Sequence, residues 1–411
     1  MKASPIDRRL GRRSFLKGGL AGLAGAALLP AGAHERPGAQ PQAAARRASI
    51  VRTLGKTGIS LPIVSIGANA YDPGIYRRAL DEGIRHIDTS SDYANGNHER
   101  VVGEALKGRP RDSYVLATSF ATDHYQDRAK RVFKAGVRVQ PLIDSFHGSL
   151  KRLGVDHVDI YYLAWMCSRE TTLFEPYLEA VRRFQKEGKA RWIGVTTHEN
   201  EPEVLKTVAE SGAFDVVLTV YNFRQTHREE MRAAIAQAAK AGVGVVAMKT
   251  QAGASWDRKS AGQINMSAAL KWVLLDENVT TAVPGITRLD QLETDLAVMG
   301  NLALTPEEKS DLDRMERLPY YFTSLFCQQC RQCVPQCPQR LEIPALMRGS
   351  MYAYGYGLPA KAKETLRRAG ISAIPCKDCA SCGVTCTEGL DIRGKALDVI
   401  RLSEVPDDFL G

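Results

Sequence analysis

The stretch 177-YLEAVRRFQKEGKARWIGV-195 holds two different patterns in 19 residues. Residues 177–189 place apolar side chains at the spacing of one helix face, with charged residues between them. Residues 191–195 then form a short run rich in apolar and β-branched side chains. An amphipathic helix that leads into a short buried strand is typical of a parallel sheet with crossover helices.

Units of this kind recur from residue 50 to residue 315, which places the chain in the α/β class. Helical patterns such as "MRAAIAQAAKAG" separate the apolar runs, and this one ends in the Gly expected just past a helix. Eight units in about 265 residues match a (β/α)8 TIM barrel in count and length. The predicted strands are 62–67, 85–89, 114–118, 157–163, 191–195, 215–220, 243–248 and 280–284.

The two ends of this region carry further signals. "RTLGKTGISLPI", residues 52–63, has the pattern of a hairpin that would plug the bottom of the barrel. Thr305, Pro306 and Glu308 form a capping box with proline at the first helical position, which predicts one more helix after the eighth strand. We therefore assign residues 50–318 to the barrel. Active sites of this fold lie at the carboxyl ends of the strands.

Eight of the nine cysteines fall into two frames with identical CxxCxxCxxxC spacing near the C-terminus. Three thiolates on such a tight loop reach one iron-sulfur cubane, and in two-cluster ferredoxins the fourth binds the other cluster. We predict two [4Fe-4S] clusters in residues 319–411. The expected ligand sets are Cys327, Cys330, Cys333 and Cys386 for one cluster, and Cys376, Cys379, Cys382 and Cys337 for the other.

Two alternatives stay open for these thiols. Zinc sites use pairs of CxxC separated by a longer loop, and a disulfide framework is typical of small exported domains. The residues between the two frames include the helical pattern "AKAKETLRRAG". This tail resembles the helical ferredoxin modules of multidomain dehydrogenases, so we expect a small, mostly helical two-cluster domain.

The N-terminus has the pattern of a signal peptide. Six basic residues and one Asp lie in residues 1–33, followed there by a modestly apolar run and a small-residue ending. Arg12 and Arg13, followed by "SFLK", resemble a twin-arginine (Tat) signal. The resemblance implies the Tat export machinery as a partner and a periplasmic or otherwise extracytoplasmic location. Residues 34–49 would be a linker.

Much of the formal net charge of +9 lies in this segment. The remainder has no basic stripe interleaved with aromatic residues, which argues against nucleic-acid binding. No apolar stretch of about 18 residues occurs outside the N-terminus, so we expect no membrane span.

Four phrases of the barrel region resemble the aldo/keto reductases. They are "RTLGKTGIS", "HIDTSSDYANGNHERVVGEAL", "GVVAMKTQAG" and "AVPGITRLDQLETDLA". With the cysteine tail, the resemblance extends to the iron-sulfur members of that family. It implies carbonyl reduction with NADPH, a Tyr as general acid, an Asp-paired Lys that lowers the pKa of that Tyr, and a His that orients the substrate.

Asp88 and Tyr93 match the Asp and Tyr of this tetrad. Ser119 stands where the family has the Lys, in "ATS", and Ala164 stands where it has the His, in "LA". A free tyrosine has a pKa near about 10 and needs a nearby ammonium to give up its proton at neutral pH. We therefore expect ordinary carbonyl reduction to be impaired, by up to about 10²- to 10⁴-fold.

The nicotinamide site implied by the resemblance is altered as well. Thr196, Thr197 and Leu218 replace the Ser, Asn and Gln of the family. The phosphate-binding turn retains more of the family's residues. Beside it, Asp295 replaces an Asn, and an acid at this position would repel a phosphate. NADP(H) is thus a possible cofactor, and its candidate ligands are Gly285, Thr287, Arg288 and Gln291.

These observations predict an exported oxidoreductase whose two clusters pass single electrons to or from a barrel pocket containing Asp88 and Tyr93. Its partner would be a redox protein or a small-molecule substrate. The alternatives are a catalytically inactive scaffold or electron-transfer module, and an NADPH-dependent carbonyl reductase. Further strand-end candidates for the pocket are Trp165, Met166, Cys167, His198, Tyr221, Asn222 and Lys249, with His124 in the loop above the third strand.

Overall fold

The computed structural model describes residues 49–410 except 69, 128–129, 252–264, 318–326, 328–330, 356–357, 378, 380–381 and 388. The predicted signal peptide, residues 1–33, lies outside the described residues, as does the linker up to residue 48. No helix among the described residues combines the length and the apolar character that a bilayer crossing requires.

Seven parallel strands form one curled sheet in the order β11-β10-β9-β8-β7-β4-β3. The segment around residues 64–66 completes the ring, because Val64 bridges to Ala282 of β11 and Ile66 bridges to Ile87 of β3. The predicted barrel is confirmed, although its first strand, expected at 62–67, is present only as these two bridges. The strands are β3 (His86–Asp88), β4 (Val115–Ala121), β7 (Val158–Met166), β8 (Ala190–Thr197), β9 (Val216–Val220), β10 (Gly244–Met248) and β11 (Thr281–Ala282).

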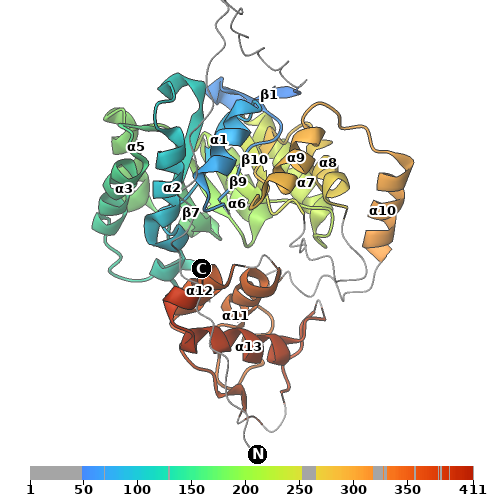
Figure 1. Cartoon of the computed structure of the whole chain (residues 1–411). Helices are drawn as coiled ribbons and strands as arrows, with labels where there is room; N and C mark the ends of the chain where they lie inside the picture. The colour runs from blue at the N-terminus through green and yellow to red at the C-terminus, as the bar shows by residue number, and fades with distance from the viewer. Residues whose placement is uncertain are drawn as a thin grey trace, which may run out of the picture. The chain divides into compact units, whose positions relative to one another are not determined.

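Helices surround this sheet (Figure 1). They follow the strands in alternation, as the periodicity predicts, and the helix predicted from the capping box is α10, where the Thr305 and Glu308 side chains bond each other's backbone N–H at 3.1 and 2.8 Å. The helices are α1 (Pro73–Asp81), α2 (Asn97–Leu106), α3 (Gln140–Leu153), α4 (Arg169–Thr172), α5 (Glu175–Lys186), α6 (Glu201–Ser211), α7 (Arg228–Lys240), α8 (Met266–Leu274), α9 (Leu289–Val298) and α10 (Pro306–Arg317).

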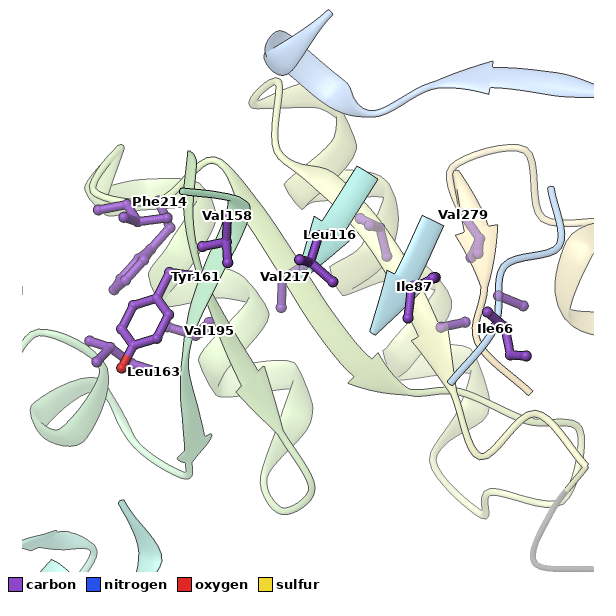
Figure 2. Packing of buried hydrophobic residues seen from close by; sticks show 14 of the residues in the cluster. Ile66, Ile87, Leu116, Val158, Tyr161, Leu163, Val195, Phe214, Val217 and Val279 are labelled. Carbon is purple, nitrogen blue, oxygen red and sulfur yellow. The ribbon is translucent and has the colours of Figure 1, made fainter. Parts of the chain in front are cut away.

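The strand side chains alternate between two apolar layers. On β7, Tyr161 and Leu163 belong to the layer between sheet and helices, whereas Ile160 and Tyr162 belong to the layer inside the barrel. Figure 2 shows Ile66, Ile87 and Leu116 of the outer layer, from neighbouring strands. Because both faces of the parallel sheet are largely buried, its strands read as nearly continuous apolar runs.

The predicted hairpin consists of β1 (Val51–Thr53) and β2 (Ser60–Pro62), which pair antiparallel. Leu54 and Leu61 are fully buried and belong to the same cluster as the side chains inside the barrel. The Lys56 N–H donates to the Gly242 carbonyl at 2.7 Å, just before β10 begins. The hairpin therefore closes the amino-terminal end of the barrel, as expected from the sequence.

One element is absent from the sequence-based expectation. After β4 the chain forms a small hairpin of β5 (Gln126–Asp127) and β6 (Val132–Phe133). Each of these strands has only two residues, which is too short for an alternating apolar pattern to be recognised in the sequence. This insertion lies in the loop at the carboxyl end of β4.

The C-terminal part is mostly helical, as predicted. It contains α11 (Ile343–Ser350), a short π-helical turn (Met351–Gly355), α12 (Pro359–Arg368) and α13 (Ile392–Ile400). Its apolar core includes Leu346 of α11, Leu366 of α12 and Val399 of α13, each at most 1% exposed. Helix α12 corresponds to the "AKAKETLRRAG" pattern between the two cysteine frames.

The hairpin offers a test of the barrel closure. Gly55 has φ +48°, and a Cβ there would lie 2.4 Å from the Gly242 carbonyl oxygen. We expect Gly55→Ala to lower the free energy of unfolding by about 2–5 kcal/mol, from left-handed backbone strain together with overpacking. Thermal unfolding measures the change.

Gly58→Ala in the same hairpin is the matched control. Gly58 also has a left-handed conformation, φ +71°, but nothing lies within 4 Å of its Cβ position. Gly58→Ala should lower the free energy of unfolding by only about 1–2 kcal/mol. Equal losses for the two variants would contradict the close approach at Gly55.

Candidate functional site

Asp88 and Tyr93 line one cavity at the carboxyl ends of the strands, where the fold places active sites. Asp88 is the last residue of β3, and Tyr93 begins the 3₁₀ turn η2 (Tyr93–Gly96) that follows it. The cavity measures about 80 Å³. Its walls come from several strand ends and from the C-terminal part, and besides Asp88 and Tyr93 they are Gly67, Ala68, His198, Met248, Lys249, Thr250, Gln251, Val283, Gly285, Tyr352 and Lys361.

Asp88 is a buried carboxyl group. Its side chain is 6% exposed, and among the described residues its Oδ1 atom accepts no hydrogen bond. Burial raises the pKa of Asp88 to about 8, while Lys361 acts to lower it. At neutral pH the group is therefore mostly protonated and is able to donate a hydrogen bond into the cavity.

Tyr93 keeps its phenolic proton over the physiological range. Burial raises the pKa of Tyr93 well above its usual value, and the Asp92 and Asp88 carboxylates raise it further. The ring meets the His98 ring edge-to-face, with 6.0 Å between centroids. His98 itself is buried, and its Nδ1 and Nε2 atoms lie 2.6 Å from the hydroxyls of Thr89 and Tyr76, so it is a structural residue.

Ser119 and Ala164 do not line the cavity, although they occupy the tetrad positions of Lys and His. The Ser119 hydroxyl donates to Ser90 Oγ at 2.6 Å, and Ser90 in turn donates to Asp92. Ala164 is buried in β7, and its carbonyl accepts from the Thr122 hydroxyl at 2.6 Å. Neither side chain reaches the space between Asp88 and Tyr93.

Lys361 and Tyr352 line the cavity and are absent from the sequence-based candidates. The Lys361 Nζ lies 4.0 Å from the centroid of the Tyr93 ring and 4.7 Å from that of the Tyr352 ring. Loss of hydration lowers the pKa of Lys361 to about 8, and Asp92 and Asp88 partly offset this effect. Both residues belong to the C-terminal part, and no motif links them to the barrel in the sequence.

One ion pair and one hydrogen bond hold helix α12 against η2 and the residue before it. Arg368 donates to the Asp92 carboxylate at 2.9 Å and to the Asp92 carbonyl at 3.1 Å. Arg367 donates to Asn95 Oδ1 at 3.4 Å. The turn that carries Tyr93 is thus fixed by residues more than 270 positions away.

Among the other strand-end candidates, His198 and Lys249 line the cavity. The His198 ring stacks on Trp165 with 3.8 Å between centroids, and the Arg348 guanidinium lies 4.4 Å from the Trp165 centroid. Burial lowers the pKa of Lys249 to about 7, and Cys327 acts to raise it. The cavity is not lined by Met166, Cys167, Tyr221 or Asn222, and His124 lies in a different, larger cleft.

The described cysteines of the two frames are free thiols, so no disulfide joins them. Cys327, Cys333 and Cys386 line one small cavity of about 10 Å³. The pKa of Cys376 is raised by burial and by the neighbouring thiols of Cys379, Cys337 and Cys382. These two groups are the predicted ligand sets, except that Cys330 lies outside the described residues.

Hydrogen bonds hold the two frames together. The Gln336 side chain accepts from the Thr385 N–H at 2.8 Å and donates to the Thr385 carbonyl at 3.3 Å. These residues directly precede Cys337 and Cys386, the fourth cysteines of the two frames. Arg393 of α13 donates to the Cys379 and Cys376 carbonyls at 3.1 and 3.3 Å.

The donor set fits two cubanes, each held by three thiolates of one frame and one of the other. Within the described residues, no three His, Cys, Asp or Glu side chains have the close spacing of a single-ion site. The fit therefore rests on which thiols are neighbours. When bound, such clusters supply one-electron transfer chemistry.

Comparison with known proteins agrees with this division of the chain. The aldo/keto reductase family model matches residues 69–267, and a 4Fe-4S dicluster domain model matches residues 326–391. The chain thus has the barrel fold of the aldo/keto reductases, and its C-terminal part is similar to a 4Fe-4S dicluster domain. The second match and its eight cysteines imply two [4Fe-4S] clusters.

Curated relatives and solved structures match the barrel. An L-glyceraldehyde 3-phosphate reductase of Escherichia coli is 24% identical over 322 residues, covering 64% of this chain and 91% of the relative. The aldo-keto reductase YhdN of Bacillus subtilis is 31% identical over 156 residues, covering 38% and 44% of the two chains. A holo aldo-keto reductase structure from Bacillus halodurans covers 67% of this chain and 99% of its own, with 23% identity and a TM-score of 0.51, which supports the fold.

The residues of the candidate nicotinamide site bond one another or near neighbours. Gln291 Oε1 accepts from the Thr287 and Arg288 N–H groups at 2.7 and 3.2 Å. Arg288 pairs with Asp290 at 2.7 Å and lies on the surface. Of the four predicted ligands, only Gly285 lines the cavity. The structure brings Thr287, Arg288 and Gln291 together in one turn.

The other substituted positions also have structural partners. The Thr196 hydroxyl accepts from the Trp165 N–H at 3.2 Å, and the Thr197 hydroxyl donates to the Glu199 carbonyl at 3.0 Å. Leu218 packs inside the barrel. Burial raises the pKa of Asp295 to about 8, so at neutral pH it is mostly uncharged and would not exert the repulsion expected from the sequence.

The shared cluster ligands can be tested with paired substitutions. The double variant Cys337→Ser and Cys376→Ser should keep about four of the eight irons, because both thiols belong to one cluster. The double variant Cys337→Ser and Cys333→Ser should lose nearly all iron, because it removes a ligand from each. Iron analysis of oxygen-protected protein measures this.

Cys167→Ser is the control for iron content. Cys167 is buried at the end of β7, and its Sγ donates to Gln126 Oε1 at 3.3 Å, away from the frames. It should bind the same iron as the wild type. A loss confined to one cluster in both double variants would contradict the exchange of ligands between frames.

The buried carboxyl of Asp88 predicts a pH-dependent stability. Folded Asp88 holds its proton up to about pH 8, whereas the unfolded side chain has lost it above about pH 4. Stability from this group therefore falls as pH rises across that window, by about 1.4 kcal/mol per pH unit. Asp88→Asn should be more stable than the wild type at pH 7.5, with a smaller advantage at pH 6.

Thermal unfolding at both pH values measures this difference. Asp290→Asn is the control, because Arg288 lowers the pKa of Asp290 and the carboxylate is ionised throughout this range. Its difference from the wild type should not change between pH 6 and pH 7.5. The same constant difference for Asp88→Asn would refute a protonated Asp88.

Proposed function

We propose that this protein is an exported iron-sulfur oxidoreductase whose two clusters exchange electrons with a small substrate in the barrel cavity. The carrying observation is that the cavity and the first cysteine frame share one apolar cluster. Met248 and Val283 line the cavity with Asp88 and Tyr93, and they belong to the same buried cluster as Cys333, against which Cys327 packs. The first cluster would therefore sit beside the cavity.

The cavity itself favours a small substrate. At about 80 Å³ it is well below the roughly 300–1,000 Å³ of pockets that hold drug-sized ligands. The limited space therefore favours a ligand of few non-hydrogen atoms. A carbonyl compound of that size fits the chemistry of relatives such as the L-glyceraldehyde 3-phosphate reductase.

Three features argue for the clusters rather than NADPH as electron source. Ser119 and Ala164 replace the Lys and His of the tetrad, so we propose that the tetrad is degenerate. Lys361 and Tyr352 of the C-terminal part line the cavity beside Asp88 and Tyr93. The N–H groups of the phosphate-binding turn already bond Gln291.

Export is the remaining component of the proposal. It rests on the twin-arginine pattern at Arg12 and Arg13, which lies outside the described residues. A redox protein outside the cytoplasm would then be the electron partner. The clusters would be inserted before export, as a pathway for folded proteins allows.

The test uses anaerobically purified holoprotein and paramagnetic resonance of the clusters. We expect no reduction by NADPH, full reduction by dithionite, and reoxidation of the reduced protein by a two- or three-carbon aldehyde or ketone. Reduction of the carbonyl to an alcohol takes one electron from each of the two clusters and two protons. The double variant Cys337→Ser and Cys376→Ser keeps one cluster and holds one electron per chain, so two chains would have to react with each carbonyl and reoxidation should be slower. Stopped-flow absorbance gives the rates.

Two results would redirect the proposal. Reduction by NADPH would favour an NADPH-dependent carbonyl reductase, in agreement with the kept phosphate-binding turn. Reduced protein that no carbonyl compound reoxidises would favour a scaffold or electron-transfer module, in which Lys361 and Tyr352 simply occupy the mouth of the barrel.

A further inference from the structure

The barrel lacks an ammonium group on β4, where Ser119 stands. The Ser119 hydroxyl is instead the first member of a hydrogen-bonded series through Ser90 to Asp92. Asp92 then accepts from Arg368 of α12 at 2.9 Å. The polar contacts that start at the substituted position therefore end on a helix of the dicluster domain.

The same helix, α12, places the ammonium group of Lys361 at the cavity. Lys361 and Arg368 are seven residues apart on α12, which places them on one helix face. Arg368 fixes that face to Asp92, and Lys361 reaches the ring of the next residue, Tyr93, at 4.0 Å. Among the described residues no carboxylate forms an ion pair with Lys361, so its charge is directed at the cavity.

The charge of Lys361 acts on the groups of the barrel site. It lowers the pKa of Asp88 and that of His98, and it is itself influenced by Asp92 and Asp88. The rings of Tyr93 and Tyr352 both face its ammonium, which is a favourable arrangement of a cation with aromatic faces. The ammonium of Lys361 thus lies over the ring of Tyr93, the predicted acid.

We propose that Lys361, carried by helix α12 of the dicluster domain, supplies the cation that the barrel lacks at Ser119 and binds the oxygen of a small carbonyl or carboxylate ligand. The inference rests on the proposed function only for the reaction; ligand binding by Lys361 is independent of it. The barrel cavity is then completed by a second domain, so neither part forms the site alone.

The ligand class follows from size and charge. The cavity of about 80 Å³ favours a ligand of few non-hydrogen atoms. An ammonium in a partly dehydrated site favours an oxygen that carries negative charge or acquires it during reduction. A 2-oxo acid has both a carboxylate and a carbonyl oxygen within this size, so pyruvate is a suitable probe.

The amine of Lys361 must be protonated to attract the ligand oxygen. Its titration therefore sets the direction in which ligand binding changes with pH. Ligand binding and turnover should be present below about pH 8 and fall above it, because the pKa of Lys361 is lowered to about 8. The titratable and charged groups that face Lys361 are Asp88, Asp92, Tyr93, His98, Lys249, Tyr352 and Arg368.

Three variants distinguish an effect of the Lys361 charge from an effect on folding. Lys361→Met removes the charge, Lys361→Arg keeps it at all accessible pH values, and Lys363→Met is the matched control. Lys363 lies two positions along α12, where it bonds Val405 and pairs with Asp407 at 2.8 Å, away from the barrel. Iron content of each holoprotein verifies that the clusters are intact; if Lys361→Met loses iron, Lys361→Gln takes its place.

The first measurement is pyruvate binding to the oxidised holoprotein by calorimetry. Lys361→Met should weaken binding at least tenfold at pH 7, and Lys363→Met should not change it. Lys361→Arg should restore most of the affinity, and its decline above pH 8 should be smaller than that of the wild type, because only the ionisation of Asp88 then contributes. The absence of pyruvate binding by the wild type, or equal affinities for Lys361→Met and Lys363→Met, would overturn the inference.

The second measurement is reoxidation of dithionite-reduced protein by pyruvate and by acetaldehyde. Lys361→Met should slow it by about 10²-fold or more relative to Lys363→Met. If no variant is reoxidised but binding still depends on Lys361, the proposed function fails and the inference stands. If reoxidation proceeds equally in Lys361→Met and Lys363→Met, the inference fails and the proposed function stands.

Discussion

The ion pair between Asp92 and Arg368 is the contact on which the candidate site depends. Both side chains are largely buried, with 16% and 21% exposure. Removing one partner of such a pair leaves a charge without compensation, at a cost of about 3–5 kcal/mol. Because Asp92 directly precedes Tyr93, the same contact fixes the turn that carries the tyrosine.

That turn would be costly to form without outside support. Ala94 and Asn95 adopt left-handed backbone conformations, with φ of 48° and 53°, which non-glycine residues seldom use. Such strain persists where the surroundings impose it, and it gathers at functional sites. Here part of the surroundings is α12, through Arg368 and Arg367, so the dicluster domain helps to impose the geometry of the barrel site.

Most of the fold was predictable from the sequence. The strands of the parallel sheet are buried on both faces, which makes them continuous apolar runs, and the helices between them have clear periodicity. The length predicted for the first strand was too great, because only Val64 and Ile66 pair with neighbouring strands, and only as isolated bridges. The β5–β6 hairpin was missed, because two residues per strand give no pattern.

The candidate site was predictable only in part. Asp88, Tyr93 and the cysteines follow from motif spacing, and the neighbours of Cys376 agree with the predicted exchange of ligands. Lys361 and Tyr352 were missed, because a lone Lys on an amphipathic helix has the same pattern as a solvated surface residue. Only the packing of α12 against η2 shows that Lys361 enters the cavity.

The hydrogen bonds between Gln336 and Thr385 bear on biogenesis. They join segments nearly 50 residues apart, each directly before a thiol that completes the other frame's cluster. With the predicted ligand sets, one cubane has all its ligands only when the ribosome has passed Cys382, and the other only when it has passed Cys386. Cofactor loading is thus a late event, and a polypeptide that ends before Cys382 would lack a ligand of both metal centres.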